Sequence, residues 1–439
     1  MSADTNGGPP TIAVVLPGGG ARGAYEAGAL AELLPALEAR GERVSIFCGT
    51  SVGAINAAQL ASLADRPAAE ATATTVQRWT DMRKGDVIRR MVGPGLPLTV
   101  ARFIGETLEL PGVSVAGLLN PSPLRASLDR WIDWDNLHAN TRSGRVRAAC
   151  IVATSISHGR PVAFVESAGT LPANPSGSEL RYLGVELAGE HVRASAAIPL
   201  LFPPVEVGGP EGIAGHYIDG GTRLNTPIQP ALALGAQRVI VIGFEPFAGS
   251  APRNGHGHKP KLADIAANVI DGLLVDQVGD DLQRLVSINS FFAEDASAGP
   301  SPAARAYRRS RGRAPYRKIS YALVSPRERG AIGAIAESVF QRRYSGLRGL
   351  RAPDYPLLSR LAGGSTKSRG ELLSFLLFDP EFTSELIDLG RGDARRWLDR
   401  HPGFWCSDPA HDFEGHDGHR DRLREEDALD EFRSRLRRV

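Results

Sequence analysis

A serine between two glycines is the residue of this chain best placed to act as a nucleophile. The spacing Gly49-x-Ser51-x-Gly53 is typical of a sharp strand-to-helix turn that exposes a serine hydroxyl. Glycines suit both flanking positions because a Cβ there would clash with neighbouring backbone. The chain is rich in glycine, however, so the spacing alone predicts an ordinary tight turn equally well.

The segments on either side of Ser51 are those that such a turn requires. Val44–Cys48 is a short β-branched and aromatic run that predicts a buried strand, and Ala54–Ala64 is rich in helix formers. The N-terminus of that helix would direct its partial positive charge at the serine oxygen and stabilise negative charge developing there. Strand, turn and helix therefore follow in the order that a nucleophilic serine needs.

A glycine-rich loop precedes this turn. Thr11–Leu16 is a continuous apolar run, which predicts a fully buried central strand, and a helix is expected over residues 24–40, bent or restarted at Pro35. The intervening Gly18-x-Gly20-x-x-Gly23 matches the dinucleotide-binding fingerprint in its letters. A nucleotide fold also needs an acidic residue about 20 positions further on, and the second strand instead ends at Cys48.

We therefore interpret the loop as a set of backbone N–H groups that face an oxyanion formed when Ser51 attacks a carbonyl. Arg22 would orient this loop or attract a phosphate head group, and a solvated arginine is the alternative. Nucleotide binding by the loop stays open as a second interpretation.

An aspartate follows later in the chain, at the end of another predicted strand. Asp219 stands beside Gly220 and Gly221, where neighbouring backbone can approach closely, and an Asx-turn aspartate is the alternative. Upstream, residues 146–155 and 161–166 predict a hairpin, and residues 198–204 form an apolar loop that suits a pocket wall. Ser195 ranks below Ser51 as nucleophile because it lacks flanking glycines. Alternating strands and helices predict a layered α/β domain.

These three motifs, in this order, resemble the patatin-like phospholipase family, and the similarity extends over residues 11–243. The resemblance implies a mostly parallel central sheet flanked by helices, with a Ser51 nucleophile and an Asp219 base but no histidine between them. Hydrolysis of a phospholipid or related acyl lipid would pass through an acyl-enzyme without metal or other cofactor. The oxyanion donors would come from Gly18, Gly19, Gly20, Ala21 and Arg22, with Gly49, Gly53, Gly220 and Gly221 supporting the motifs.

A histidine usually activates a catalytic serine, so the histidines need a separate test. His216 alone lies near a motif, three residues before Asp219. α/β-Hydrolases place their histidine after the acid, so His216 stands in the wrong order.

Composition excludes several other classes. A net charge of +2 gives no global reason to expect nucleic acid as a partner. The three cysteines lie far apart, which suits a reducing compartment, and we expect a cytoplasmic protein with no signal peptide or membrane span.

Arg305–Lys318 contains seven basic residues and no acid, which predicts either peripheral contact with anionic lipid or a solvated loop.

We expect a disordered N-terminus over residues 1–10, a catalytic domain over 11–325, a helical extension over 326–410 and a charged tail over 411–439. Apolar segments at 91–98 and 103–119 would form a lid or a core-packing insertion. A metal site is a weak alternative near the C-terminus, because the spacing of its residues fits no standard zinc pattern. Its candidate ligands are Cys406, His411, His416 and His419.

The sequence therefore predicts a serine lipid acyl hydrolase. An esterase or thioesterase acting on soluble acyl substrates is the alternative enzyme. A nucleotide-binding protein and a membrane-docking scaffold with an inactive site are the alternatives outside that class.

Overall fold

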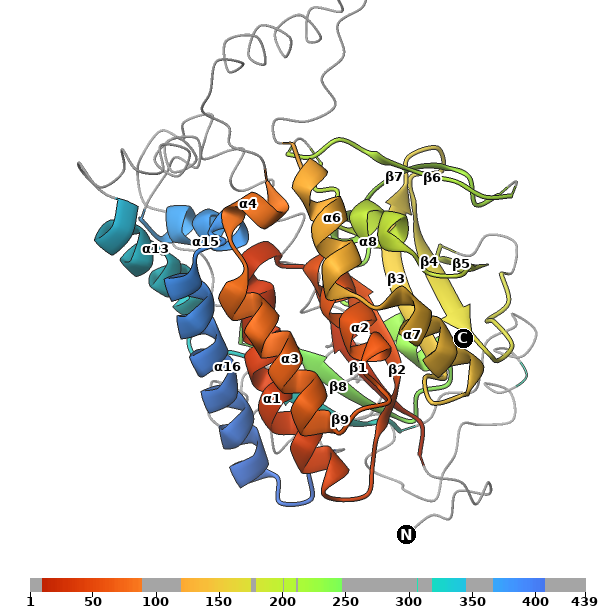
Figure 1. The fold of residues 1–439 in the computed structure, drawn as a ribbon. Coiled ribbons are helices and arrows are strands. Elements are labelled where there is room, and N and C mark those ends of the chain that lie inside the picture. The colour runs from red at the N-terminus through yellow and green to blue at the C-terminus, as the bar shows by residue number, and fades with distance from the viewer. Residues whose placement is uncertain are drawn as a thin grey trace, which may run out of the picture.

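The computed structural model describes residues 10–88, 120–174, 179–199, 201–210, 212–246, 306, 318–344 and 366–406. A central sheet runs through these residues, and α1, α3 and α16 lie side by side across one of its faces (Figure 1). The predicted α/β class, with a mostly parallel sheet and a helical C-terminal region, is confirmed.

The sheet has the strand order β5-β4-β3-β2-β1-β8-β9, with β7 pairing to β3 and to β6. The β3–β2, β2–β1, β1–β8 and β8–β9 pairs are parallel. The β3–β4, β3–β7 and β6–β7 pairs are antiparallel. Every residue of β1 and β3 is buried, and so is every residue of β8 except Arg238. This burial explains their continuous apolar sequences. The strands are β1 Ile12–Leu16, β2 Val44–Thr50, β3 Ala148–Ser155, β4 Arg160–Ser167, β5 Arg181–Gly184, β6 Val205–Val207, β7 Gly215–Asp219, β8 Arg238–Ile242 and β9 Ser320–Val324.

Helices connect these strands and form most of the C-terminal part. The first, α1, continues through Pro35, where a bend or restart was expected. The helices are η1 Gly20–Arg22, α1 Gly23–Glu38, α2 Val52–Ser62, α3 Ala68–Asp81, α4 Lys84–Val87, α6 Ser122–Trp131, α7 Trp134–Arg142, α8 Gly189–Ser195, η2 Gly220–Thr222, α9 Ile228–Ala233, α13 Ala331–Tyr344, α15 Thr366–Leu376 and α16 Pro380–Arg400.

The longest C-terminal helix, α16, packs closely along α1. A Cβ on Gly28 would lie 2.2 Å from the Ile387 carbonyl oxygen, and one on Gly390 would lie 2.2 Å from that of Tyr25. The Tyr25 hydroxyl also donates to Asp393 Oδ2 at 2.9 Å. Because glycine stands at both contact points, the two helix backbones approach more closely than ordinary side chains would allow.

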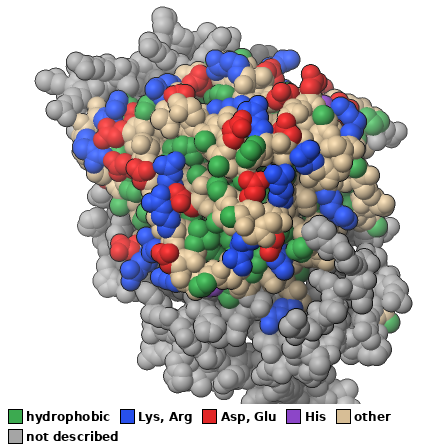
Figure 2. All heavy atoms as spheres, turned by 60° about the horizontal axis from the view of Figure 1, so that its bottom comes forward, with side chains coloured by type: hydrophobic (Ala, Val, Ile, Leu, Met, Phe, Trp, Pro, Cys, Tyr) green, Lys and Arg blue, Asp and Glu red, His purple; other side chains and the backbone are tan. Residues whose placement is uncertain are grey.

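The face at the amino end of the parallel strands carries acidic and basic side chains interspersed with apolar ones (Figure 2). Within the described residues, no helix combines the length and the apolar content needed to cross a bilayer. The predicted lid segments, the charged tail and all of Arg305–Lys318 except residues 306 and 318 lie outside the described residues.

Candidate active site

Ser51 occupies the turn between β2 and α2 in a strained backbone conformation. Its φ and ψ are 54° and −121°, a region that costs a non-glycine residue on the order of 1–3 kcal/mol. Among the described residues other than glycine, only Phe404 shares a positive φ. The side chain is nearly buried, at 4% exposure, yet it borders a cavity. Strain of this kind persists only where surrounding packing enforces it, and it marks Ser51 as a candidate functional residue.

The glycines around Ser51 allow that packing. A Cβ on Gly53 would lie 2.1 Å from the Leu16 carbonyl oxygen at the end of β1, and one on Gly49 would lie 2.2 Å from the carbonyl oxygen of Gly53. Neither position can hold a side chain without moving backbone. The clash expected from the sequence is therefore present, and it fixes the serine turn directly against the start of the glycine loop.

Asp219 ends β7 and lies beside the serine turn. Its Oδ1 accepts a 2.7 Å hydrogen bond from the Gly221 N–H, whereas its buried Oδ2 has no hydrogen-bond partner among the described residues. Complete burial raises the pKa of Asp219 to about 7, against the lowering effect of the Ser51 hydroxyl and the Gly221 N–H. The Ser51 hydroxyl thus lies close enough to stabilise the carboxylate but short of a well-formed hydrogen bond, as is common in unliganded sites.

The glycine loop has two classes of backbone amide. The Gly18 N–H donates to Asn225 Oδ1 at 3.0 Å, and the Arg22 N–H donates to the Gly19 carbonyl at 3.2 Å. The N–H groups of Gly19, Gly20 and Ala21 donate no hydrogen bond to another described residue. The loop therefore presents three available donors next to the serine turn, and the Asn225 side chain fixes its first residue.

Ser195 supports the turn from the end of α8. Its Oγ accepts a 2.8 Å hydrogen bond from the Ser51 N–H and donates to the Val152 carbonyl on β3 at 2.5 Å. Ser195 is completely buried. With its hydroxyl engaged on both sides, Ser195 holds the backbone of Ser51 in place.

Histidine takes no part in this arrangement among the described residues. His216 and Asp219 are three positions apart on one strand, so their side chains point to opposite faces, and His216 is exposed. None of the described histidines hydrogen-bonds to Ser51 or Asp219. No group of three or more His, Cys, Asp or Glu side chains in the described part of the chain is arranged to hold a metal ion.

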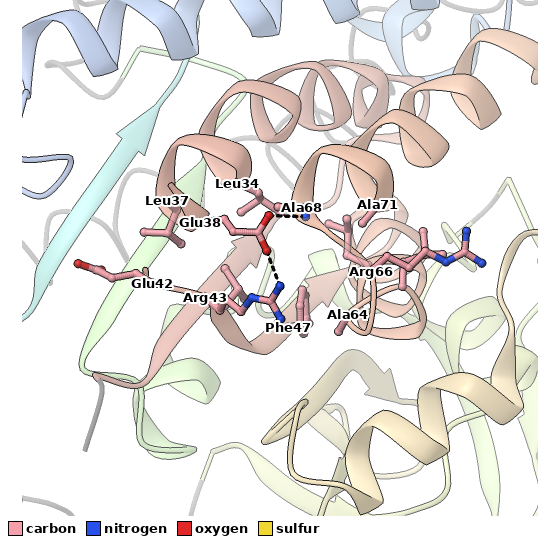
Figure 3. A pocket seen from close by; sticks show the side chains of 13 residues that line it. Leu34, Leu37, Glu38, Glu42, Arg43, Phe47, Ala64, Arg66, Ala68 and Ala71 are labelled. Carbon is pink, nitrogen blue, oxygen red and sulfur yellow. Dashed lines mark hydrogen bonds and ion pairs between the residues drawn. The ribbon is translucent and has the colours of Figure 1, made fainter. Parts of the chain in front are cut away.

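An apolar cavity opens beside Ser51. The predicted wall from residues 198–204 is present in Ile198 and Phe202, and Trp131 of α6 also lines the cavity. Aromatic residues from the C-terminal part were not anticipated there. A second hollow, at the opposite end of β2, contains no serine or cysteine that could act as a nucleophile (Figure 3).

Residues 14–232 match the family model described as patatin-like phospholipase. This segment contains the glycine loop, the serine turn and the aspartate, in the order that the resemblance requires. Residues 14–232 belong to the patatin-like phospholipase family. The patatin-like segment thus contains the strained serine, the buried acid and the available amides, whereas part of the cavity wall comes from outside it.

Two solved structures show distant similarity to the chain. VipD from Legionella pneumophila matches at 12% identity and a TM-score of 0.31, covering 90% of this chain and 67% of that one. ExoU, in its complex with SpcU from the type III secretion system of Pseudomonas aeruginosa, matches at 18% identity and a TM-score of 0.24, covering 89% and 72%. A comparison with curated proteins gives no match.

Proposed function

We propose that this patatin-like protein hydrolyses carboxylic ester bonds of acyl lipids with Ser51 as nucleophile and Asp219 as base. The observation that carries the proposal is a serine in a strained backbone turn, beside a buried carboxyl group whose second oxygen has no hydrogen-bond partner among the described residues. A pKa of about 7 suits a general base at neutral pH. Asp219 can therefore take over the proton-transfer role that histidine has in most serine hydrolases.

In the first half-reaction, the Ser51 hydroxyl passes its proton to Asp219 Oδ2 as its oxygen attacks the ester carbonyl. The N–H groups of Gly19 and Gly20 stabilise the resulting oxyanion, together with that of Val52 in the first turn of α2. The sequence motifs did not single out Val52. Collapse of the tetrahedral intermediate breaks the ester bond, and the leaving alcohol takes the proton from Asp219.

In the second half-reaction, Asp219 removes a proton from water, which attacks the acyl-enzyme. The fatty acid leaves as Ser51 recovers its proton from Asp219. No further proton acceptor is needed, because the same carboxyl group acts as base and then as acid in each half.

The apolar cavity favours a lipid over a small polar ester. Its lining beside Ser51 consists almost entirely of aliphatic and aromatic side chains, which suit an alkyl chain. Peripheral contact with anionic membrane through Arg305–Lys318 remains part of the proposal. Flotation with anionic and neutral vesicles tests it, and equal binding to both would remove it.

The direct test is covalent capture of Ser51 by a fluorophosphonate, followed by mass spectrometry of products from a panel of phospholipids and neutral lipids. We expect labelling and fatty-acid release by the wild type and neither by Ser51→Ala. Hydrolysis of soluble short-chain esters alone would favour an esterase. Stabilisation by NAD or ATP without labelling would favour a nucleotide-binding protein.

A further inference from the structure

A segment from the C-terminal part lies directly against the glycine loop. Gly20 has a φ of 59°, and a Cβ on it would lie 2.2 Å from the Phe375 carbonyl oxygen in α15. The left-handed conformation and the close approach both require glycine at this position. The loop that we propose to hold the oxyanion is thus in direct contact with α15, a helix outside the patatin-like segment.

Arg22 fixes this contact. Its Nε donates to Ser374 Oγ at 2.7 Å, and its Nη2 donates to the carbonyl and the Oε2 of Glu371 at 3.0 and 2.6 Å. The guanidinium carbon also lies 4.0 Å from the centre of the Phe375 ring. Arg22 is only 1% exposed, which rules out the alternative of a solvated arginine. A buried guanidinium engaged in this way holds α15 and is not placed to meet a phosphate head group.

The same segment supplies part of the cavity wall beside Ser51. Phe375, Leu376 and Phe378 line the cavity together with residues of the patatin-like segment such as Ile55 and Trp131. Phe375 and Phe378 are 4% and 8% exposed. An alkyl chain attached at Ser51 would therefore lie against aromatic rings that come from α15 and the residues following it.

This wall is held rigidly. Phe378 lies in the short junction between α15 and α16, and the next residue, Asp379, is buried and accepts a 2.9 Å hydrogen bond from the Glu381 N–H. Behind the wall, α13 packs tightly on α15, since a Cβ on Gly370 would lie 2.4 Å from the Gly333 carbonyl oxygen. A wall packed this closely limits the space that is available to a substrate.

We propose that Phe375 and Phe378 set the length of acyl chain accepted beside Ser51, and that Arg22 and Glu371 position them. This inference rests on the proposed acyl hydrolase function. Specificity for chain length arises because a methylene group that fits an apolar pocket raises kcat/KM by about tenfold or more. Removing an aromatic ring from the wall makes room for more methylenes and shifts the preference to longer chains.

The test measures kcat/KM for nitrophenyl esters from butyrate to palmitate. In Phe375→Ala and Phe378→Ala, we expect the ratio of palmitate to octanoate hydrolysis to rise by about tenfold. Phe378→Leu serves if the alanine variant fails to fold. Phe340→Ala is the matched control: Phe340 is a buried aromatic residue of α13 that does not line the cavity, so its loss should leave the ratio unchanged.

The positioning role of Glu371 has its own readout. Glu371→Ala should shift the chain-length ratio in the same direction as Phe378→Ala, and Glu371→Gln, which keeps an oxygen acceptor for Arg22, should restore it. A merely structural role would lower hydrolysis of every ester alike and leave the ratio unmoved.

The affinities for octanoate and palmitate, measured by calorimetry, separate this inference from the proposed function, because fatty-acid binding requires no turnover. Tighter palmitate binding by Phe378→Ala without hydrolysis of any ester would overturn the function but support the assignment of the wall. Ester hydrolysis with an unchanged length ratio and unchanged fatty-acid binding would overturn the inference. Absence of both hydrolysis and binding would overturn both.

Discussion

Strand β2 has an apolar hollow at each end, and the two ends differ in the state of their carboxyl groups. At the amino end, Leu34, Leu37 and Phe47 line the hollow beside Glu38 (Figure 3). Glu38 accepts hydrogen bonds from the Ala68 N–H at 2.8 Å and from Arg43 Nη2 at 2.5 Å. The bond from Ala68, followed by the contact with Arg43, lowers the pKa of Glu38. This carboxylate is ionised and fully partnered.

At the carboxyl end, Asp219 is fully buried with one oxygen unpartnered among the described residues, and its pKa is raised to about 7. Ser51 stands beside it in a strained turn. An apolar hollow is thus not by itself a site. An acid with a pKa raised to about 7, next to a serine in a strained turn, distinguishes one end from the other.

The largest expected effect comes from serines at the two ends of α2. Ser51→Ala should lower kcat by at least about 10⁴-fold because it removes the nucleophile. Ser62→Ala, at the far end of the same helix, should leave kcat within about twofold, since the Ser62 hydroxyl only donates to the Gln59 carbonyl. Lipid hydrolysis under saturating substrate measures both. Equal losses would show that α2 matters only for stability.

Replacing the acids should give the next largest effect. Asp219→Asn should lower kcat by about 10³-fold or more, because an amide cannot accept the serine proton. Glu38→Gln should change kcat by less than about twofold, since no reacting group lies at its end of β2. His216→Asn should retain most activity. Loss of activity in His216→Asn with retention in Asp219→Asn would reject the dyad.

The pH profile should separate the two ends without a large change in structure. Because the ionised form of Asp219 is the base, kcat/KM should rise about tenfold per pH unit up to about pH 7 and then level off. Glu38→Gln should leave this profile unmoved. Initial rates across a buffer series measure it, and a profile that is flat between pH 5 and 8 would contradict the role of Asp219.

Stability should show opposite signs at the two ends. The folded pKa of Asp219 is raised from 3.8 to about 7, so the folded state loses stability as pH rises through this window. The change in the free energy of unfolding caused by Asp219→Asn should therefore be more stabilising at pH 8 than at pH 4, by roughly 1–4 kcal/mol. Glu38 has a lowered pKa, so it stabilises above its ordinary value of 4.5 and Glu38→Gln should destabilise at pH 8. Urea unfolding at both pH values measures the two signs, and a uniform effect of Asp219→Asn would contradict the pKa shift.

The local sequence predicted the strands and turns whose formation depends on residues that are close together in the chain. The strands β1 and β2 were recognisable because central parallel strands are buried on both faces, and the turn at Ser51 because glycines stand where backbones meet. The position of Asp219 followed from the motif that the family resemblance supplied.

The remaining features depend on contacts between distant segments. No local pattern reveals that Asn225 holds Gly18, that Ser195 holds the Ser51 amide, or that Phe378 reaches the cavity. Trp131 packs against the core and also lines the cavity. The second contact could not be predicted, because an amphipathic helix has the same sequence pattern whether its apolar face meets the core or a cavity. The burial of Arg22 could not be predicted either, since its partners Glu371 and Ser374 follow 349 and 352 positions later in the chain.

That separation has a consequence for biosynthesis. A ribosome that adds about 5–20 residues per second needs roughly 17–70 s to extend the chain from Arg22 to Glu371. During this interval the nascent chain carries an arginine without the carboxylate that it is buried with, and burial of an unpaired charge is strongly unfavourable. We therefore expect the glycine loop, although among the first parts to be translated, to reach its final conformation only after Glu371 has been added, so that an incomplete chain would lack a finished candidate site.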